Sequence, residues 1–267
     1  MTINILFIGD IIGRPGRRLV RDLLPSLVTT YEVDLVVANG ENAAGGLGLT
    51  IKAAEELFNC GVDVLTSGNH IFRHKEIYDY FDSQPYLIRP ANYPDSCPGR
   101  GWVMARTNAG EPVGIINLIG RTYMEPLDCP FRMAKEAIAD LASEGVKMMF
   151  VDFHAEATSE KKALGWYLDG QVGAVVGTHT HVQTADAAVL PNGTGYLTDA
   201  GMTGGQASVI GMKSEAVIQR FMTGLPSRFE VSKRDLRLEG CVVGLDPRSG
   251  MAEKVERIQK VAKMSQK

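Results

Sequence analysis

Residues 172–181, VGAVVGTHTH, run from an apolar segment directly into two histidines one residue apart. The chain has only five histidines in 267 residues, and two of them lie here. A short apolar run bounded by glycine is typical of a strand that is covered on both faces. The segment therefore predicts a buried strand whose end carries chemically active side chains.

The same pattern occurs elsewhere in the chain. Further apolar runs end in small, acidic, amide or histidine residues: INILFI (3–8), VDLVVA (33–38), VDVLT (62–66), VGIINLIG (113–120) and MMFVD (148–152). The segments between them favour helices at 15–30, 51–60, 73–82, 131–144 and 159–168. This alternation predicts an α/β fold, in which functional groups gather at the carboxyl ends of the strands.

The pattern changes after residue 190. Short strands are expected in GYLTDAGMTG (195–204), ASVIGMK (207–213) and GCVVGLD (240–246), with a helix near 214–223. These strands suggest a second, partly antiparallel sheet packed on the first. Residues 250–266 are interpreted as an amphipathic helix. No repeat or linker interrupts the chain, so residues 1–267 are expected to form a single domain.

Composition limits the partners. A formal net charge of −3 argues against a strong nucleic-acid-binding surface, but it leaves room for a small anionic substrate. No apolar stretch reaches the roughly 18–20 residues that span a bilayer, so no membrane association is expected. No signal peptide is recognised and the cysteines form no C-x-x-C pair, which favours a cytoplasmic location.

The two neighbouring histidines, His179 and His181, point to one side if the strand continues through them. Paired imidazoles on a rigid backbone suit a divalent metal ion. The alternative is that one is a hydrogen-bonded core residue and the other lies at the surface. Taken alone, H-x-H does not decide between these interpretations.

The residues that follow the other apolar runs favour a metal site. Polar side chains that can ligate metals follow separate apolar runs: Asp10, Glu41, Asn42, Asn69, His70 and His154. Placing them at the ends of buried strands costs free energy unless each finds a partner. Few basic residues lie in these segments, whereas metal ions satisfy carboxylates, imidazoles and amides together. The set is too large for one tetrahedral zinc and fits two ions with a bridging carboxylate, with Mn, Fe or Zn preferred over calcium.

These motifs resemble the calcineurin-like metallophosphoesterases, and within them the YmdB-like bacterial branch of 2′,3′-cyclic-nucleotide 2′-phosphodiesterases. The resemblance rests on GDIIGRPGR, NGENAAGG, TSGNHIF, DFHAEATSEK, GTHTHVQTAD and LTDAGMTG, in this order over nearly the whole chain. It implies a four-layer αββα sandwich of two mixed sheets flanked by helices. Three positions depart from the wider superfamily pattern: Ile12 replaces a histidine, Glu41 an aspartate and Ile71 a glutamate. The same departures resemble the YmdB-like branch.

The resemblance also implies the roles of individual residues. Asp10 and His181 would bind one metal ion, and Glu41 would bridge both. The second ion would be bound by Asn42, Asn69, His154 and His179. His70 would be the general acid, although a hydrogen bond to a metal ligand is an alternative role. Iron or manganese is favoured, and zinc also fits this ligand set.

The leading hypothesis is therefore a dinuclear metal-dependent phosphodiesterase. It would convert small phosphodiesters, with 2′,3′-cyclic nucleotides preferred, to 3′-nucleotides through a metal-bridging hydroxide. A phosphomonoesterase or nuclease with the same site is a second hypothesis, and an RNA-associated regulatory scaffold with little turnover is a third. Arg14, at the start of a predicted helix, is a candidate for phosphate binding, with a solvated charge as its alternative. A homo-oligomer is consistent with such an enzyme.

Overall fold

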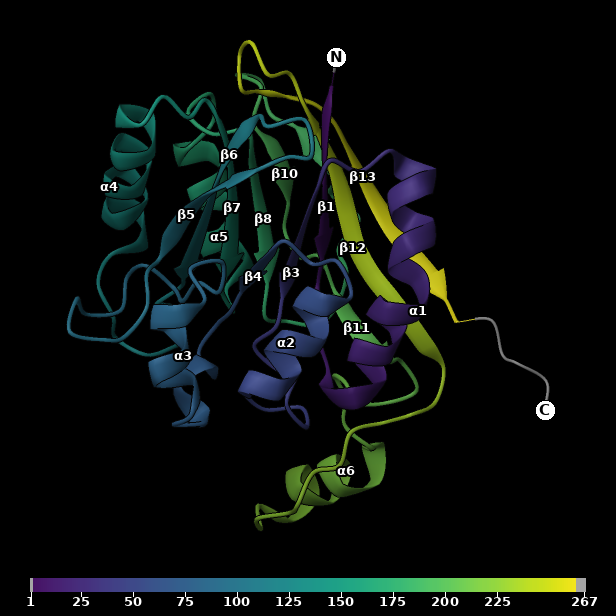
Figure 1. Ribbon diagram of the computed structural model, residues 1–267. Coiled ribbons are helices and arrows are strands. Elements are labelled where there is room, and N and C mark those ends of the chain that lie inside the picture. Colours follow the sequence, from purple (N-terminus) through teal and green to yellow (C-terminus); the bar gives the residue numbers. More distant parts are fainter. Residues whose placement is uncertain (1, 263–267) are drawn as a thin grey trace.

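The computed structural model describes residues 2–262, which contain two β-sheets lying face to face (Figure 1). The first sheet has the order β2-β11-β12-β1-β3-β4, with β13 paired to β12. Its strands are β1 (Ile3–Ile8), β2 (Asp10–Ile11), β3 (Leu35–Asn39), β4 (Val64–Thr66), β11 (Met202–Gly205), β12 (Leu236–Leu245) and β13 (Ala252–Val261). The second sheet has the order β5-β6-β7-β8-β10-β9. Its strands are β5 (Trp102–Arg106), β6 (Pro112–Ile119), β7 (Met148–His154), β8 (Ala174–Thr178), β9 (Ala188–Val189) and β10 (Gly195–Leu197).

Helices form the outer layers. They are α1 (Gly13–Tyr31), α2 (Ile51–Asn59), α3 (Ile77–Ser83), α4 (Pro130–Ser143), α5 (Thr158–Tyr167) and α6 (Ser214–Thr223), with a 3₁₀ turn at Ile71–Arg73. Helices α1 and α2 cover the first sheet, and α4 and α5 cover the second, whereas α6 projects from one end (Figure 1). This arrangement confirms the αββα sandwich. Among residues 2–262, no helix is long and apolar enough to span a bilayer.

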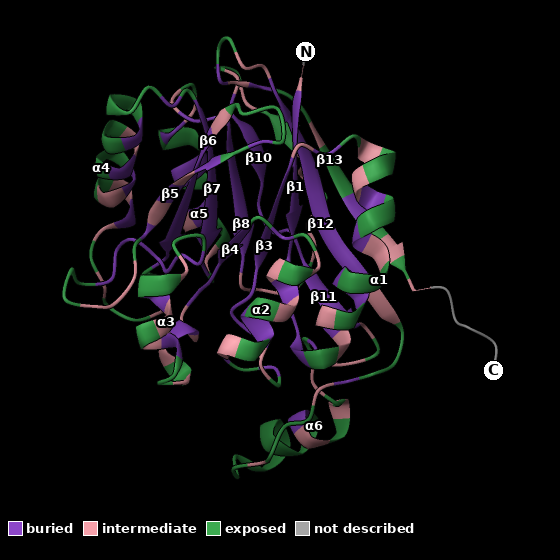
Figure 2. Cartoon of the chain, in the orientation of Figure 1, coloured by how far each residue is buried: buried purple, intermediate pink, exposed green. Residues whose placement is uncertain are grey.

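Alternate side chains of a strand pack in different apolar layers. In β1, Ile3, Ile5 and Phe7 face the second sheet, whereas Leu6 and Ile8 face the helices. Successive side chains of a strand point to opposite faces, so a fully apolar run supplies both layers at once. Figure 2 shows these central strands buried along their length.

The parallel strands of both sheets end on the same side of the molecule. In the first sheet, β1, β3 and β4 are parallel. In the second, β6, β7 and β8 are parallel, and His154 at the end of β7 pairs in register with Thr178 at the end of β8. We call this side the carboxyl edge; helix α6 projects beyond it (Figure 1).

The expected location of the C-terminal strands was wrong. Strands β11, β12 and β13 extend the N-terminal sheet instead of forming the second sheet, because β12 pairs antiparallel with β1. The second sheet is built mainly from the middle of the chain. Residues 207–213 form no regular strand; they make a tight turn with isolated bridges and positive φ at Ile210 and Gly211. The sequence could not show this because strand pairing is a long-range property.

The helix expected at 250–266 was also wrong within the described residues. Strand β13 pairs with β12 over its whole length, and residues 263–266 lie outside the described range. Val255 packs between the sheets and Ile258 packs on the helix side. Residues three apart in a strand face opposite sides, so apolar side chains on both faces reproduced the spacing of an amphipathic helix.

Phe7 tests the packing between the sheets. Its ring centroid lies 5.1 Å from that of Phe150 on the second sheet, and its side chain is fully buried. Phe7→Ala should lower the free energy of unfolding by about 3–5 kcal/mol, because a cavity would replace the ring. Chemical denaturation measures this value. Phe221→Ala, which alters an exposed ring on α6, should change it by less than about 0.5 kcal/mol; equal effects would contradict the layer assignment.

Candidate metal centre

Two buried carboxylates lie at the centre of the carboxyl edge. Asp10 begins β2 and Glu41 follows β3, and both side chains are almost fully shielded from solvent. The backbone N–H of His179 donates to Asp10 Oδ2 over 3.0 Å, whereas Asp10 Oδ1 has no hydrogen-bond partner among the described residues. Burial raises the pKa of Asp10. A buried carboxylate oxygen without a donor is costly unless a proton or a cation compensates it, and a metal ion would supply that charge.

Glu41 belongs to two groups of ligand atoms. One group contains Asp10, Glu41 and His181, and the other contains Glu41, His154 and His179. In each group, one ligand atom from every residue lies within 4.8 Å of the others. A shared carboxylate between two ligand groups is the arrangement expected of two neighbouring ions, which lie about 3.5–4 Å apart in dinuclear sites.

Three possible hydrogen-bond acceptors surround the Nε2 atom of His154. Its Nε2 lies 3.2 Å from Glu41 Oε2 and 3.0 Å from both Asn69 Oδ1 and His179 Nδ1. A single N–H cannot donate to three acceptors with good geometry. A cation would satisfy all four atoms together, and the nitrogen and oxygen donors suit a transition-metal ion.

The pKa values of the two histidine rings in this group shift in opposite directions. Burial works to lower the pKa of His154, but the carboxylates of Glu41 and Asp10 outweigh it and raise that pKa to about 9. The pKa of His179 falls to about 3, through burial and repulsion from His154. One ring therefore carries the positive charge that balances the carboxylates when no metal is bound. A metal ion would replace that proton.

Asn42 and His70 adjoin the Glu41 carboxylate. Asn42 Nδ2 donates to Glu41 Oε1 over 2.7 Å and lies 3.3 Å from His181 Nε2. His70 Nδ1 lies 2.9 Å from Asn42 Oδ1 and 3.2 Å from Glu41 Oε1. Both neighbours of this nitrogen are acceptors, so Nδ1 carries a proton and donates. The ring is one-third exposed, which leaves its other side accessible to a ligand.

The structure therefore brings together all the residues that the sequence predicted as ligands. Glu156 also reaches the site, since its Oε2 lies 3.0 Å from His179 Nε2. Arg14 is different: it is exposed in the first turn of α1, and no hydrogen bond or ion pair within residues 2–262 connects it to the cluster. Its role in phosphate binding stays a prediction.

Sequence reasoning missed a buried polar network behind His154. Thr178 Oγ1 lies 3.0 Å from His154 Nδ1 and donates to Asp152 Oδ1 over 2.8 Å. Asn39 Nδ2 donates to the other Asp152 oxygen over 2.9 Å. Such contacts fix the orientation of an imidazole ligand. The available signal was Asn39 directly after one apolar run and Asp152 at the end of another.

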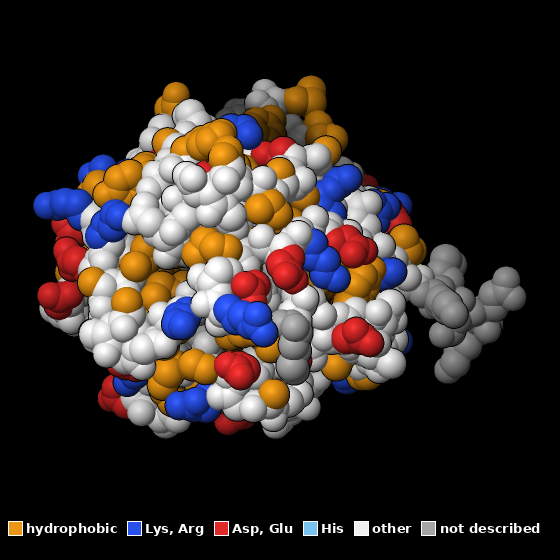
Figure 3. Space-filling model, turned by 90° about the horizontal axis from the view of Figure 1, so that it is seen from above, with side chains coloured by type: hydrophobic (Ala, Val, Ile, Leu, Met, Phe, Trp, Pro, Cys, Tyr) orange, Lys and Arg blue, Asp and Glu red, His pale blue; other side chains and the backbone are white. Residues whose placement is uncertain are grey.

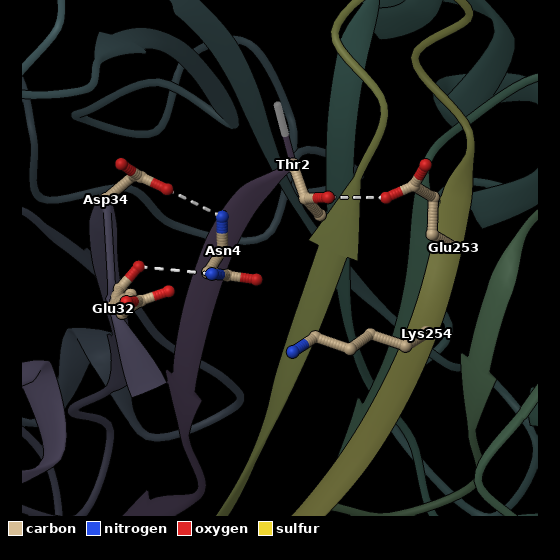
Figure 4. Close-up of a pocket in the computed structure, with 6 residues that line it drawn as sticks. All are labelled: Thr2, Asn4, Glu32, Asp34, Glu253 and Lys254. Carbon is tan, nitrogen blue, oxygen red and sulfur yellow. Dashed lines mark hydrogen bonds between the residues drawn. The ribbon is translucent and has the colours of Figure 1, made fainter. Parts of the chain in front are cut away.

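A shallow pocket at the opposite edge is a weaker candidate. Several of its polar groups bind each other: Asn4 donates to the Glu32 carbonyl and to Asp34, and Thr2 donates to Glu253 (Figure 4). Asn4 Oδ1 has no partner among the described residues, but no histidine adjoins it in the lining. Acidic and basic side chains are interspersed on that face of the molecule (Figure 3). The carboxyl edge is therefore the best candidate for chemistry.

Comparison with known proteins identifies the family. The family model described as "YmdB-like protein" matches residues 6–258. The chain belongs to the YmdB-like family. A 2′,3′-cyclic-nucleotide 2′-phosphodiesterase of Bacillus subtilis is 51% identical over 255 residues, which cover 96% of each chain.

Solved structures agree with this assignment. A crystal structure of a novel phosphatase from Mycoplasma pneumoniae superposes with a TM-score of 0.90 and is 36% identical, covering 98% of this chain and 94% of that one. A 5′-nucleotidase precursor from Thermus thermophilus has a TM-score of 0.59 at 15% identity, covering 98% of this chain and 54% of that one. The second comparison shows a shared fold alone.

Gly68 tests the ligand assignment by steric exclusion. A Cβ at this position of the YmdB-like chain would lie 2.2 Å from Glu41 Oε2 and 2.4 Å from His154 Nε2. Gly68→Ala should therefore abolish binding of an ion that His154 and Glu41 would hold, which metal analysis of the purified protein would measure. Gly145→Ala controls for destabilisation alone: its φ of 82° strains an alanine, but no atom lies within 4 Å of a Cβ there. Full metal content in Gly68→Ala would contradict the assigned site.

Proposed function

We propose that this YmdB-like protein is a dinuclear metal-dependent phosphodiesterase that hydrolyses 2′,3′-cyclic nucleotides to 3′-nucleotides. The observation that carries the proposal is the sharing of Glu41 between the two ligand groups at the carboxyl edge. The activity of the Bacillus subtilis relative supports the substrate class. The unpartnered Asp10 oxygen supports the presence of metal.

Seven side chains would hold the two ions. Asp10 and His181 would bind the first, and Glu41 would serve both. The residues proposed for the second ion are Asn42, Asn69, His154 and His179. Iron or manganese is favoured, and zinc also fits, because oxygen and nitrogen ligands accept all three. When bound, the two ions activate water and offset the negative charge that develops on the phosphoryl oxygens.

His70 is proposed to protonate the leaving ribose oxygen. Its Nδ1 proton is held by Asn42 and Glu41, so the protonated ring would present the Nε2 proton to a substrate. The 2′-oxygen of the ribose is a poor leaving group, and proton donation to it is typically worth about 10²–10⁴-fold in rate.

The remaining parts of the proposal concern partners and setting. The substrate is a small phosphodiester, the protein acts in the cytoplasm, and residues 1–267 form a single domain. A phosphomonoesterase activity at the same site is the second candidate, because the similar Mycoplasma pneumoniae structure is described as a phosphatase. Turnover of 2′,3′-cAMP, 3′-AMP and an RNA oligomer by the same preparation separates these activities.

Glu41→Gln tests the bridging role. The amide cannot offer two anionic oxygens, so metal content should fall from two ions to one or none, and turnover of 2′,3′-cAMP should fall by about 10²-fold or more. Elemental analysis and product quantification measure these changes. Glu55→Gln, on the exposed side of α2, is the matched control. Two retained ions with full turnover would exclude a bridging Glu41.

His70→Ala tests proton donation. The variant should keep both ions, while kcat for 2′,3′-cAMP falls by about 10²–10⁴-fold. A substrate with a p-nitrophenolate leaving group needs little protonation, so its turnover should fall much less. His74→Ala is the control, because that ring contacts the Leu47 carbonyl. Equal losses on both substrates would instead favour a hydrogen-bonding role for His70 beside the ligands.

A further inference from the structure

A buried ion pair lies beneath the segment that carries His179 and His181. Lys161 on α5 and Asp199 after β10 are both almost completely buried, and their Nζ and Oδ2 atoms lie 2.7 Å apart. The mechanism above uses neither residue. They occur in the motifs DFHAEATSEK and LTDAGMTG, which the metal ligands alone do not explain.

The pair binds the residues that alternate with the two histidines. Lys161 Nζ donates to the Thr178 carbonyl over 2.7 Å. Asp199 Oδ2 accepts from the Thr180 backbone N–H over 3.1 Å and from the Thr180 hydroxyl over 2.7 Å. The two charged groups therefore anchor the segment at the residue before each histidine.

The backbone of this segment needs an anchor. His179 has φ 97° and His181 has φ 64°, so both lie in a region that residues with side chains rarely adopt. Such conformations persist only where surrounding contacts determine them. The conformation matters because it turns one ring toward each ligand group.

The packing around the pair is equally tight. A Cβ at residue 177 would lie 1.9 Å from the Thr198 carbonyl oxygen and 3.0 Å from Lys161 Cδ. Gly177 therefore lets the end of β8 approach both the chain before Asp199 and the stem of Lys161. Close contacts in the interior therefore fix the positions of Lys161 and Asp199.

We propose that Lys161 and Asp199 are positioning residues that preset His179 and His181, and so couple the two metal positions through one segment. This inference rests on the metal ligands of the proposed function. Removing the two charges should weaken the binding of both ions together, because His179 belongs to one ligand group and His181 to the other.

The test variant is Lys161→Met/Asp199→Asn. Removing both charges avoids leaving one of them buried alone, and the new amide keeps an oxygen for Thr180. The matched control is Lys213→Met/Glu230→Gln, which removes an exposed ion pair in the same way. Circular dichroism establishes that each variant is folded.

Titration of the metal-free proteins with Mn²⁺, followed by calorimetry and electron paramagnetic resonance, gives two affinities and the exchange-coupled signal of paired ions. In the test variant we expect both dissociation constants to rise by about 10–100-fold and the coupled signal to weaken. The control should match the wild type. Unchanged affinities would overturn the inference, and so would weakening at one ion only.

Two further outcomes are distinguishable. Wild-type protein that binds no Mn²⁺ pair would contradict the proposed function itself, and the inference would fall with it. If the double variant does not fold, Thr180→Val decides the question, because it removes one bond to Asp199 and leaves the ion pair in place. A several-fold loss of Mn²⁺ affinity at both ions would then support the inference, whereas wild-type affinity would overturn it.

Discussion

The rest of the structure depends on the electrostatic interaction between the Glu41 carboxylate and the histidine rings around it. Burial works to raise the pKa of Glu41, yet the rings of His154 and His70 hold that pKa well below its ordinary value, so the group stays anionic. A buried anion is tolerated only when positive charge and hydrogen-bond donors surround it. The first sheet supplies that anion and the second sheet supplies His154. The αββα sandwich therefore brings two oppositely charged strand ends together.

Much of the architecture could be predicted because the apolar runs are local signals. A run such as INILFI supplies side chains to two apolar layers, which is typical of a central strand. The distribution of strands between sheets could not be predicted, because nothing local in β12 shows that it pairs with β1. Strand β13 was misassigned because Val255 and Ile258 serve different apolar layers. In both cases tertiary pairing overrode the local pattern.

The candidate site was more predictable than the fold around it. Polar residues directly after buried strands must meet at one edge, so Asp10, Glu41 and His154 could be grouped without coordinates. The supporting residues were not visible in this way. Lys161 lies within a helical pattern, where lysine usually indicates a solvated face, and Asp152 lies in a strand between two apolar residues. Their burial became evident only when two sheets and a helix were placed together.

The order of the ligands along the chain has a consequence for how the protein is made. The donors extend from Asp10 to His181, and strand β1, which leads to Asp10, lies between β3 and the late strand β12. A ribosome must therefore synthesise nearly the whole chain before the donors can converge. A nascent chain offers only scattered single ligands, which bind ions weakly. Binding of the two proposed ions would consequently be a late step, set by strand order.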